Sequence, residues 1–238
     1  MVRERDRGAF AFVRGTTPRT LTEILLVKRF LLVALLAPAI AGTQSYTYPA
    51  FQLPTLVERE YNFAAADGGK AGTTLLFQWR EATGPRWQLG VDAGLADPDG
   101  NASTRLVLGG HAAWQWTRAT TDFPFDVAVT GGLGFSGVDG HNVWRLPIGA
   151  SVGHRFDLDG GMSITPFVHP RLSFDRCNDC RLGGTDSKLN VAVDLGGSLQ
   201  ITEQVALRIA ITAGGSDYLS SGNGIGLGVA WTPKGLRK

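Results

Sequence analysis

Between residues 55 and 232, apolar and polar residues alternate along the chain with a period of two. Successive side chains of a β-strand point to opposite faces, so this alternation predicts strands with one apolar and one polar face. We expect ten strands, near residues 55–66, 71–81, 86–96, 103–117, 124–136, 142–156, 162–175, 187–201, 204–214 and 223–232. The segment from 188 to 201 is the clearest, since its apolar residues Leu189, Val191, Val193, Leu195, Leu199 and Ile201 alternate with polar ones.

The strands are longer than those of an ordinary soluble domain. A dozen alternating residues extend about 40 Å at roughly 3.3 Å per residue, whereas a soluble strand usually has about five or six residues. A tilted crossing of a membrane needs roughly nine to eleven residues. Connectors after the even-numbered strands are mostly short, and those after the odd-numbered strands are longer, for example at residues 97–101 and 176–186. The sequence therefore predicts an all-β chain, an up-and-down antiparallel transmembrane β-barrel of about ten strands, with eight as the alternative.

The heights of the aromatic residues indicate which face points outward. Tryptophan favours the headgroup level of a membrane, so two aromatic rims separated by aliphatic residues are expected of a membrane barrel. One expected rim carries Trp79, Trp87, Trp114, Trp116 and Trp231; the other carries Trp144, with Phe135, Phe174 and Tyr61 nearby. A soluble lipocalin-type binding barrel, which remains an alternative, would turn the apolar face inward.

The polar faces carry charges of both signs, mixed with glycine and threonine. Such a set can pair inside a narrow, wet barrel. The expected lumen residues are Arg80, Asp92, Arg105, His111, Asp126, Arg145, His169, Arg171, Asp194 and Arg208, with Glu58, Glu60, Arg155 and Lys188 on the same faces. The first strand fits least well, because Arg59 falls on the apolar face of Tyr61 and Phe63.

An export signal is expected before the strands. Lys28 and Arg29 precede an unbroken apolar run at residues 30–41 that closes with Ala39-Ile40-Ala41, and cleavage is predicted after Ala41. Twelve residues are too few for a transmembrane helix of about twenty. Residues 1–26 have no place in such a signal, so we expect the true start near Val27. The domains expected are a leader and signal (1–41), a short N-terminal segment (42–54), the barrel (55–232) and a tail (233–238).

With the signal, the alternating strands and the aromatic rims, the sequence resembles the small bacterial outer-membrane β-barrel proteins, the OmpA-type and porin-like group. The resemblance covers roughly residues 50–232. It implies a bacterial outer-membrane location, outer-membrane lipid as a partner, and insertion machinery that reads an aromatic residue at the end of the last strand. Here Trp231 would serve as an internal version of that signal, since residues 232–238 follow it.

Cys177 and Cys180 form a Cys-x-x-Cys in the longest expected loop, residues 176–186. An oxidising compartment favours a disulfide, with free thiols as the alternative. A zinc site would need two more ligands, and no metal is expected. A redox role would want a helix N-terminus, which this region lacks.

No catalytic cluster can be assembled from the sequence. His169, Ser173 and Asp175 share one strand face, but strand rise places the serine about 13 Å from the histidine, too far for a relay. The formal net charge of +2, with basic residues scattered among acidic ones, argues against a nucleic-acid-binding surface. We expect no cofactor and no enzymatic activity, and a structural or narrow-pore role; a lipid-modifying barrel enzyme is the alternative.

Overall fold

The computed structural model describes residues 51–67, 72–97, 103–138, 141–181, 184–214 and 224–233. The chain divides into two units, Met1–Ala39 and Ile40–Lys238, and every described residue belongs to the second. The expected leader, its cleavage site after Ala41 and the start near Val27 lie outside the described residues.

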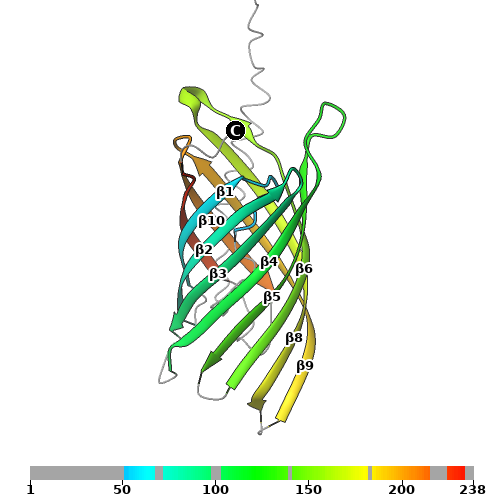
Figure 1. Cartoon of the computed structure of the whole chain (residues 1–238), viewed down its shortest axis with the longest axis vertical. Coiled ribbons are helices and arrows are strands. Elements are labelled where there is room, and N and C mark those ends of the chain that lie inside the picture. The colour runs from blue at the N-terminus through cyan, green and yellow to red at the C-terminus, as the bar shows by residue number, and fades with distance from the viewer. Residues whose placement is uncertain are drawn as a thin grey trace, which may run out of the picture. The chain divides into compact units, whose positions relative to one another are not determined.

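Ten antiparallel strands close into an up-and-down β-barrel (Figure 1). They are β1 (Arg59–Asp67), β2 (Thr73–Gly84), β3 (Trp87–Asp97), β4 (Arg105–Thr117), β5 (Asp126–Val138), β6 (His141–Gly153), β8 (Ser163–Arg181), β9 (Gly184–Gln200), β10 (Val205–Gly214) and β11 (Gly224–Trp231). Each strand pairs with the next along the chain, and β1 pairs with β11 to close the ring. The two-residue strand β7 (Phe156–Asp157) pairs only with the start of β8, and a single 3-10 turn (Asp159–Gly161) follows it. The predicted fold class and the count of ten barrel strands are confirmed.

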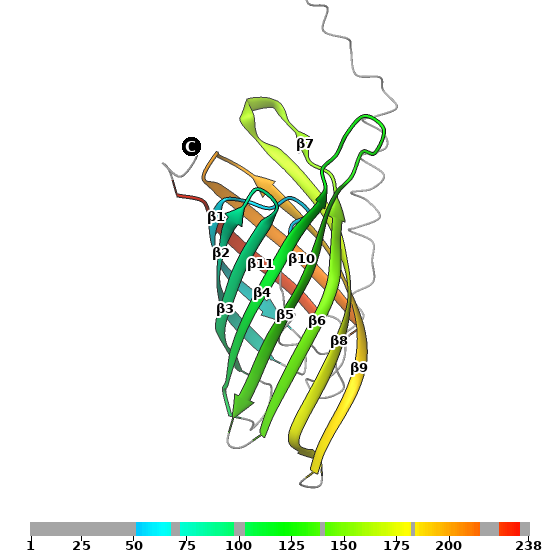
Figure 2. The same cartoon turned by 45° about the vertical axis from the view of Figure 1, so that its right-hand side comes forward.

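The barrel has two rims, which we name by the chain ends. The terminal rim holds the start of β1 at Arg59 and the end of β11 at Trp231; the distal rim is the opposite end. In Figures 1 and 2 the hairpin of β8 and β9 reaches past its neighbours at the distal rim, while the β7 region and the β4–β5 connector project at the terminal rim.

The prediction of longer connectors after odd-numbered strands is wrong for two hairpins. β8 continues to Arg181 and β9 begins at Gly184, so most of the expected loop at residues 176–186 is paired strand. Likewise only residues 139–140 separate β5 from β6, whereas residues 118–125 lie between β4 and β5 at the terminal rim. Polar residues such as Asn178 and Thr185 predict a loop by composition, but here they face each other across the hairpin, which satisfies their backbone groups.

The pattern of side-chain burial is the reverse of that in a soluble domain. Large apolar side chains on every strand point outward, so that Leu189 is 71% exposed and Phe63 is 61% exposed. Charged side chains point inward, so that Arg80 is 2% exposed and Asp175 is fully buried. The period-two pattern places the apolar face outside, and most of the side chains buried inside this closed sheet are polar or charged.

Candidate functional site

The lumen is the candidate site, because the polar side chains predicted from the sequence meet there. Nine of the ten predicted lumen residues are buried, and Arg105 is half-buried. Two other residues of the predicted polar faces do not line the lumen: Glu58 is exposed, and Arg155 is exposed in the connector after β6, where it pairs with Asp157. Both lie beyond the ends of the barrel strands, where the alternation no longer fixes an inward direction.

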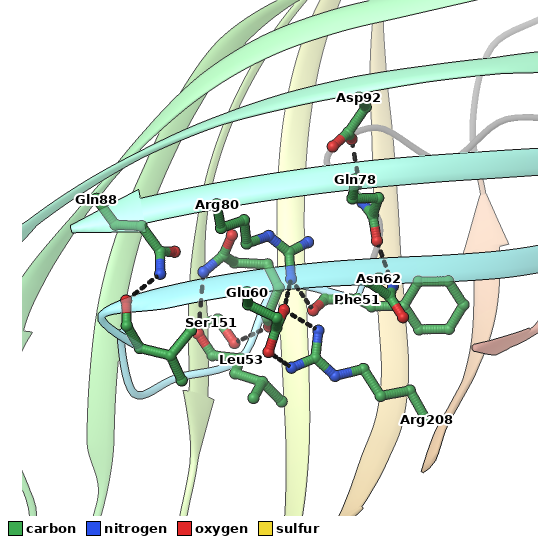
Figure 3. Close-up of polar contacts among 12 residues, drawn as sticks. Phe51, Leu53, Glu60, Asn62, Gln78, Arg80, Gln88, Asp92, Ser151 and Arg208 are labelled. Carbon is green, nitrogen blue, oxygen red and sulfur yellow. Dashed lines mark hydrogen bonds and ion pairs between the residues drawn. The ribbon is translucent and has the colours of Figure 1, made fainter. Parts of the chain in front are cut away.

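Glu60 joins two of the predicted arginines. Its carboxylate accepts hydrogen bonds from Arg80 Nη1 on β2, at 3.1 Å, and from both terminal nitrogens of Arg208 on β10, the Nη1 contact being 2.6 Å (Figure 3). All three residues are at most 3% exposed. Two guanidinium groups sharing one carboxylate satisfy the carboxylate fully, which is the condition for a buried ion pair to persist.

A chain of uncharged and charged side chains continues from this cluster across neighbouring strands. Asn62 on β1 donates to Gln78 on β2 at 2.5 Å, and Gln78 donates to Asp92 on β3 at 3.1 Å (Figure 3). Asn62 and Gln78 were not among the residues predicted from the sequence. Each occupies an inward-facing position in the alternation of its strand, so the period-two pattern alone could have identified both as lumen residues.

A second network lies on β6, β8 and β9. Arg145 on β6 donates from Nε and Nη2 to the two oxygens of Asp175 on β8, at 2.9 and 2.8 Å, and Asn190 on β9 also donates to Asp175. This fork-to-fork geometry is the strongest form of an arginine–carboxylate contact. Asp175 was considered only as a partner of His169, yet its partners come from neighbouring strands.

The third network contains a hydroxyl, an imidazole and a carboxylate in sequence. Thr130 Oγ1 on β5 lies 2.9 Å from His169 Nε2, and His169 Nδ1 lies 3.3 Å from Asp194 Oδ2 on β9. Asp194 also accepts hydrogen bonds of 2.6 Å from Arg171 and from Thr212. The expected search along one strand missed this relay, because its members lie on three strands brought together by register.

Residues 51–57, which lie ahead of β1, turn into the lumen; we call them the plug. The sequence predicted a strand from residue 55, but the paired part of β1 begins only at Arg59. Phe51, Gln52 and Pro54 are buried inside the barrel. Phe51 packs in a small apolar cluster with inward residues of several strands, among them Leu76, Val107 and Phe167. The lumen is therefore occupied by the protein's own chain as well as by its charged side chains.

Wall side chains hold the plug through its backbone. Arg80 donates to the carbonyl oxygen of Phe51 at 3.1 Å, and Ser151 donates to that of Gln52 at 2.7 Å (Figure 3). Gln115 donates to Pro54 O at 2.8 Å and accepts from Leu56 N at 2.9 Å. Gln88 donates to Val57 O at 2.8 Å. None of these contacts could be read from the sequence, since a backbone carbonyl is present at every residue.

Glycines on β11 make room for these side chains. A Cβ atom at Gly226 would lie 2.7 Å from the ring of Phe51, and one at Gly228 would lie 2.8 Å from Asn62. Gly224, Gly226 and Gly228 alternate along β11 with the outward-facing Ile225, Leu227 and Val229. Gly226 and Gly228 are buried, and a side chain at either would collide with the plug or with the Asn62 network.

The tryptophans lie on the outer surface at the predicted heights. Trp79, Trp87, Trp114, Trp116 and Trp231 lie towards the terminal rim, where Trp87 pairs with Trp114, and Trp144 lies towards the distal rim beside Phe135. Tyr61 was expected near Trp144, and that is wrong. It stacks on Trp231 and is in register with Trp79, because β1 starts at Arg59 and so places Tyr61 near the terminal rim.

The misfit of Arg59 on the apolar face is explained by its partner. Its guanidinium donates from Nε and Nη2 to both oxygens of Glu81 on β2, at 2.5 and 2.6 Å, and Trp79 Nε1 also donates to Glu81. The pair lies at the terminal rim, where long charged side chains can reach water. An arginine on the outer face is therefore tolerated there.

Cys177 is buried and disulfide-bonded. The side chain of Cys180, the partner expected from the sequence, lies outside the described residues. Cys177 is in register with Asp186 on β9, within the extended hairpin instead of the predicted loop.

Among the residues that the structure describes, no group of three or more histidine, cysteine, aspartate or glutamate side chains could hold a metal ion. Within the same residues, no helix has the length and apolar character to cross a membrane.

Comparison with known proteins gives structural likeness only. No protein-family model matches the chain, and no curated protein matches it. Similar solved structures include LpxR from Salmonella typhimurium, at 11% identity and a TM-score of 0.45 over 87% of this chain and 96% of that one. Others are the KdgM porin, at 8% identity and a TM-score of 0.37 over 74% and 99%, and the Salmonella typhi outer membrane phospholipase, at 10% and 0.33 over 79% and 94%. Likenesses this distant carry no argument about what the chain does.

Proposed function

We propose that this protein is an integral β-barrel of the bacterial outer membrane with a structural role and a closed or very narrow lumen. The observation that carries the proposal is the inverted burial: apolar side chains cover the outside and paired charges fill the inside. Monomeric soluble proteins rarely expose contiguous apolar patches beyond a few hundred Å², and here such residues line every strand. An apolar surface of this extent is stable in contact with lipid hydrocarbon.

The height of the apolar surface supports the same proposal. On β9 the outward row runs from Leu189 to Leu199 and includes Val191, Val193 and Leu195. Ten residue steps extend about 33 Å along the strand, and a tilt of about 45° reduces this to about 23 Å of height. The apolar band of an outer-membrane barrel is about 25 Å tall.

We assign the terminal rim to the periplasmic side of the membrane. Both ends of the barrel chain lie at this rim, and a chain that crosses the inner membrane first starts and finishes on that side. Trp231 lies on the outer face of the last strand at the same rim, 46% exposed. We propose that the insertion machinery reads this strand, and that outer-membrane lipid is the barrel's main partner.

The lumen supports a structural role in preference to an enzyme. The Thr130–His169–Asp194 relay has the order of a hydroxyl nucleophile, a base and an orienting acid. Yet all three residues are at most 2% exposed and face the lumen, away from the lipid that a lipid-modifying enzyme would act on. Arg171 and Thr212 also bind Asp194, as in a packed structural network. We therefore propose that the relay stabilises the barrel and has no catalytic role.

Membrane fractionation tests the proposal. The protein should be recovered from the outer-membrane fraction, resist extraction by alkaline carbonate, and migrate faster in gel electrophoresis when unheated than when boiled. Recovery in the soluble periplasmic fraction, with no difference between unheated and boiled samples, would contradict it.

A further inference from the structure

The lumen ion pairs run along the barrel wall and do not cross it. Arg145–Asp175 and Arg171–Asp194 each join neighbouring strands. Glu60 and Arg208 come from strands separated only by β11, and their side chains meet across that strand. These contacts stiffen the wall and leave the middle of the lumen to another element.

The plug is that element. Its contacts begin at Gly226 on β11, continue through Arg80, Gln88 and Gln115 on β2, β3 and β4, and end at Ser151 on β6. This arc covers more than half of the strand order around the barrel. Figure 3 shows the segment passing between side chains that come from separate strands. Whether a solute can cross the barrel therefore depends on the plug.

The plug is held in a way that permits release. The five hydrogen bonds that attach it to the wall all use its backbone atoms, so none is an ion pair. Four of these bonds involve neutral side chains, and a neutral hydrogen bond that is exchanged for one to water contributes little net free energy. The fifth is donated by the guanidinium of Arg80, which also forms an ion pair with Glu60. The wall thus binds the plug through its backbone, and the ion pairs of Glu60 with Arg80 and Arg208 do not use any atom of the plug.

Two features oppose the plug's seated position. Phe51 has a φ of 52°, a left-handed conformation that is unfavourable for a bulky residue. The side-chain oxygen Oε1 of Gln52 is buried without a hydrogen-bond partner. Both penalties disappear when the segment leaves the lumen, so they lower the free energy that release requires.

We propose that the barrel is a latent channel for small ions and that residues 51–57 are its gate. This inference rests on the proposed membrane location. With the plug seated the lumen is closed; with the plug withdrawn towards the terminal rim, water and ions pass along a wall lined by Glu60, Asp92, Arg80 and Arg208. Because the wall carries both signs of charge, we expect weak selectivity between cations and anions.

A cleavable crosslink tests the gate in the full-length protein. Cysteines replace Gln52 and Ser151, whose backbone oxygen and side-chain hydroxyl are 2.7 Å apart in the wild type, and a short thiol reagent with an internal disulfide joins them. In planar bilayers the crosslinked protein should open at least tenfold less often than the same variant after reduction. Wild-type protein treated with the same reductant controls for the disulfide at Cys177.

Two further variants weaken the attachment of the plug to the wall without a crosslink. Ser151→Ala and Gln88→Ala each remove one hydrogen bond to the plug, and each should raise the open fraction about two- to tenfold. The matched controls are Ser198→Ala and Gln200→Ala, at the terminal-rim end of β9. Gln200 bonds to the β9–β10 turn and not to the plug. These controls should leave the open fraction unchanged.

The outcomes separate the two proposals. A protein that fails to enter vesicles in the folded, heat-modifiable form contradicts the membrane location. A protein that inserts, but whose conductance is the same with the crosslink, without it and in the Ser151→Ala/Gln88→Ala double variant, contradicts the gate alone.

Discussion

The hydroxyl of Ser151 on β6 donates a 2.7 Å hydrogen bond to the backbone carbonyl oxygen of Gln52, 99 residues earlier in the chain. This contact fastens the plug to the wall opposite the strand that follows it. Together with the Glu60 cluster on β1, β2 and β10, it makes the lumen a filled interior. The two contacts differ in kind, one being a neutral bond to backbone and the other a buried network of charges.

Removing the charge of Glu60 should destabilise the barrel strongly. Glu60→Gln leaves Arg80 and Arg208 buried without their carboxylate, and an uncompensated buried charge costs about 3 kcal/mol of unfolding free energy. Urea unfolding of the protein in lipid vesicles measures the change. Glu58→Gln, two residues earlier and exposed, is the matched control and should change stability by less than about 0.5 kcal/mol. Equal effects of the two changes would contradict the role of the cluster.

An outward-facing charge should be costly only within the apolar band. Ile209 on β10 is 47% exposed and lies midway along its strand, so Ile209→Arg should destabilise the barrel in vesicles by about 2–4 kcal/mol. Ile201, at the terminal-rim turn after β9, is exposed to a similar degree. Ile201→Arg should cost at most about 1 kcal/mol. If both variants unfold at the same urea concentration as the wild type, the outer surface does not meet hydrocarbon.

The relay at His169 should affect stability and not chemistry. Thr130→Val removes the hydroxyl that lies 2.9 Å from the imidazole, and the unsatisfied ring nitrogen should cost about 1–3 kcal/mol. We expect the wild-type protein to leave phospholipids and lipopolysaccharide intact in an assay with purified lipid. Release of fatty acid by the wild type, lost in Thr130→Val, would instead show that the relay is catalytic.

The rim pair of Arg59 and Glu81 should contribute little by itself. Both side chains are about one-third exposed, and surface ion pairs are typically worth 0–1 kcal/mol. Glu81→Gln should therefore change the unfolding free energy by less than about 1 kcal/mol, even though it leaves an arginine on the outer face. A loss as large as that of Glu60→Gln would mean that Arg59 lies in hydrocarbon and not at the headgroup level.

Local alternation was enough to predict the strands and their faces. A period of two is written into each segment, so Leu207 and Arg208 could be assigned to opposite sides without knowledge of their neighbours. Register could not be predicted in this way. The Thr130–His169–Asp194 relay and the place of Tyr61 depend on which residues face each other across strands, and that follows from closure of the whole ring.

The plug could not be predicted for a different reason. Its hydrogen bonds use backbone oxygens, which leave no trace in residue type, and the alternation of residues 55–58 continues that of β1. The extended hairpin of β8 and β9 was missed because its polar tip resembles a loop in composition. Pairing of Asn178 with Thr185 satisfies the backbone there without apolar residues.

The central claim is that the outer face meets lipid and the inner face does not, and two adjacent positions on β10 test it most directly. Leu207 points outward at 44% exposure and Ala206 points inward at 3%. A fluorophore on a cysteine at either position is reconstituted in vesicles whose lipid tails carry bromine, which quenches only on close approach. The account predicts strong quenching at Leu207→Cys and weak quenching at Ala206→Cys; equal quenching at both positions, or the reverse order, would contradict it.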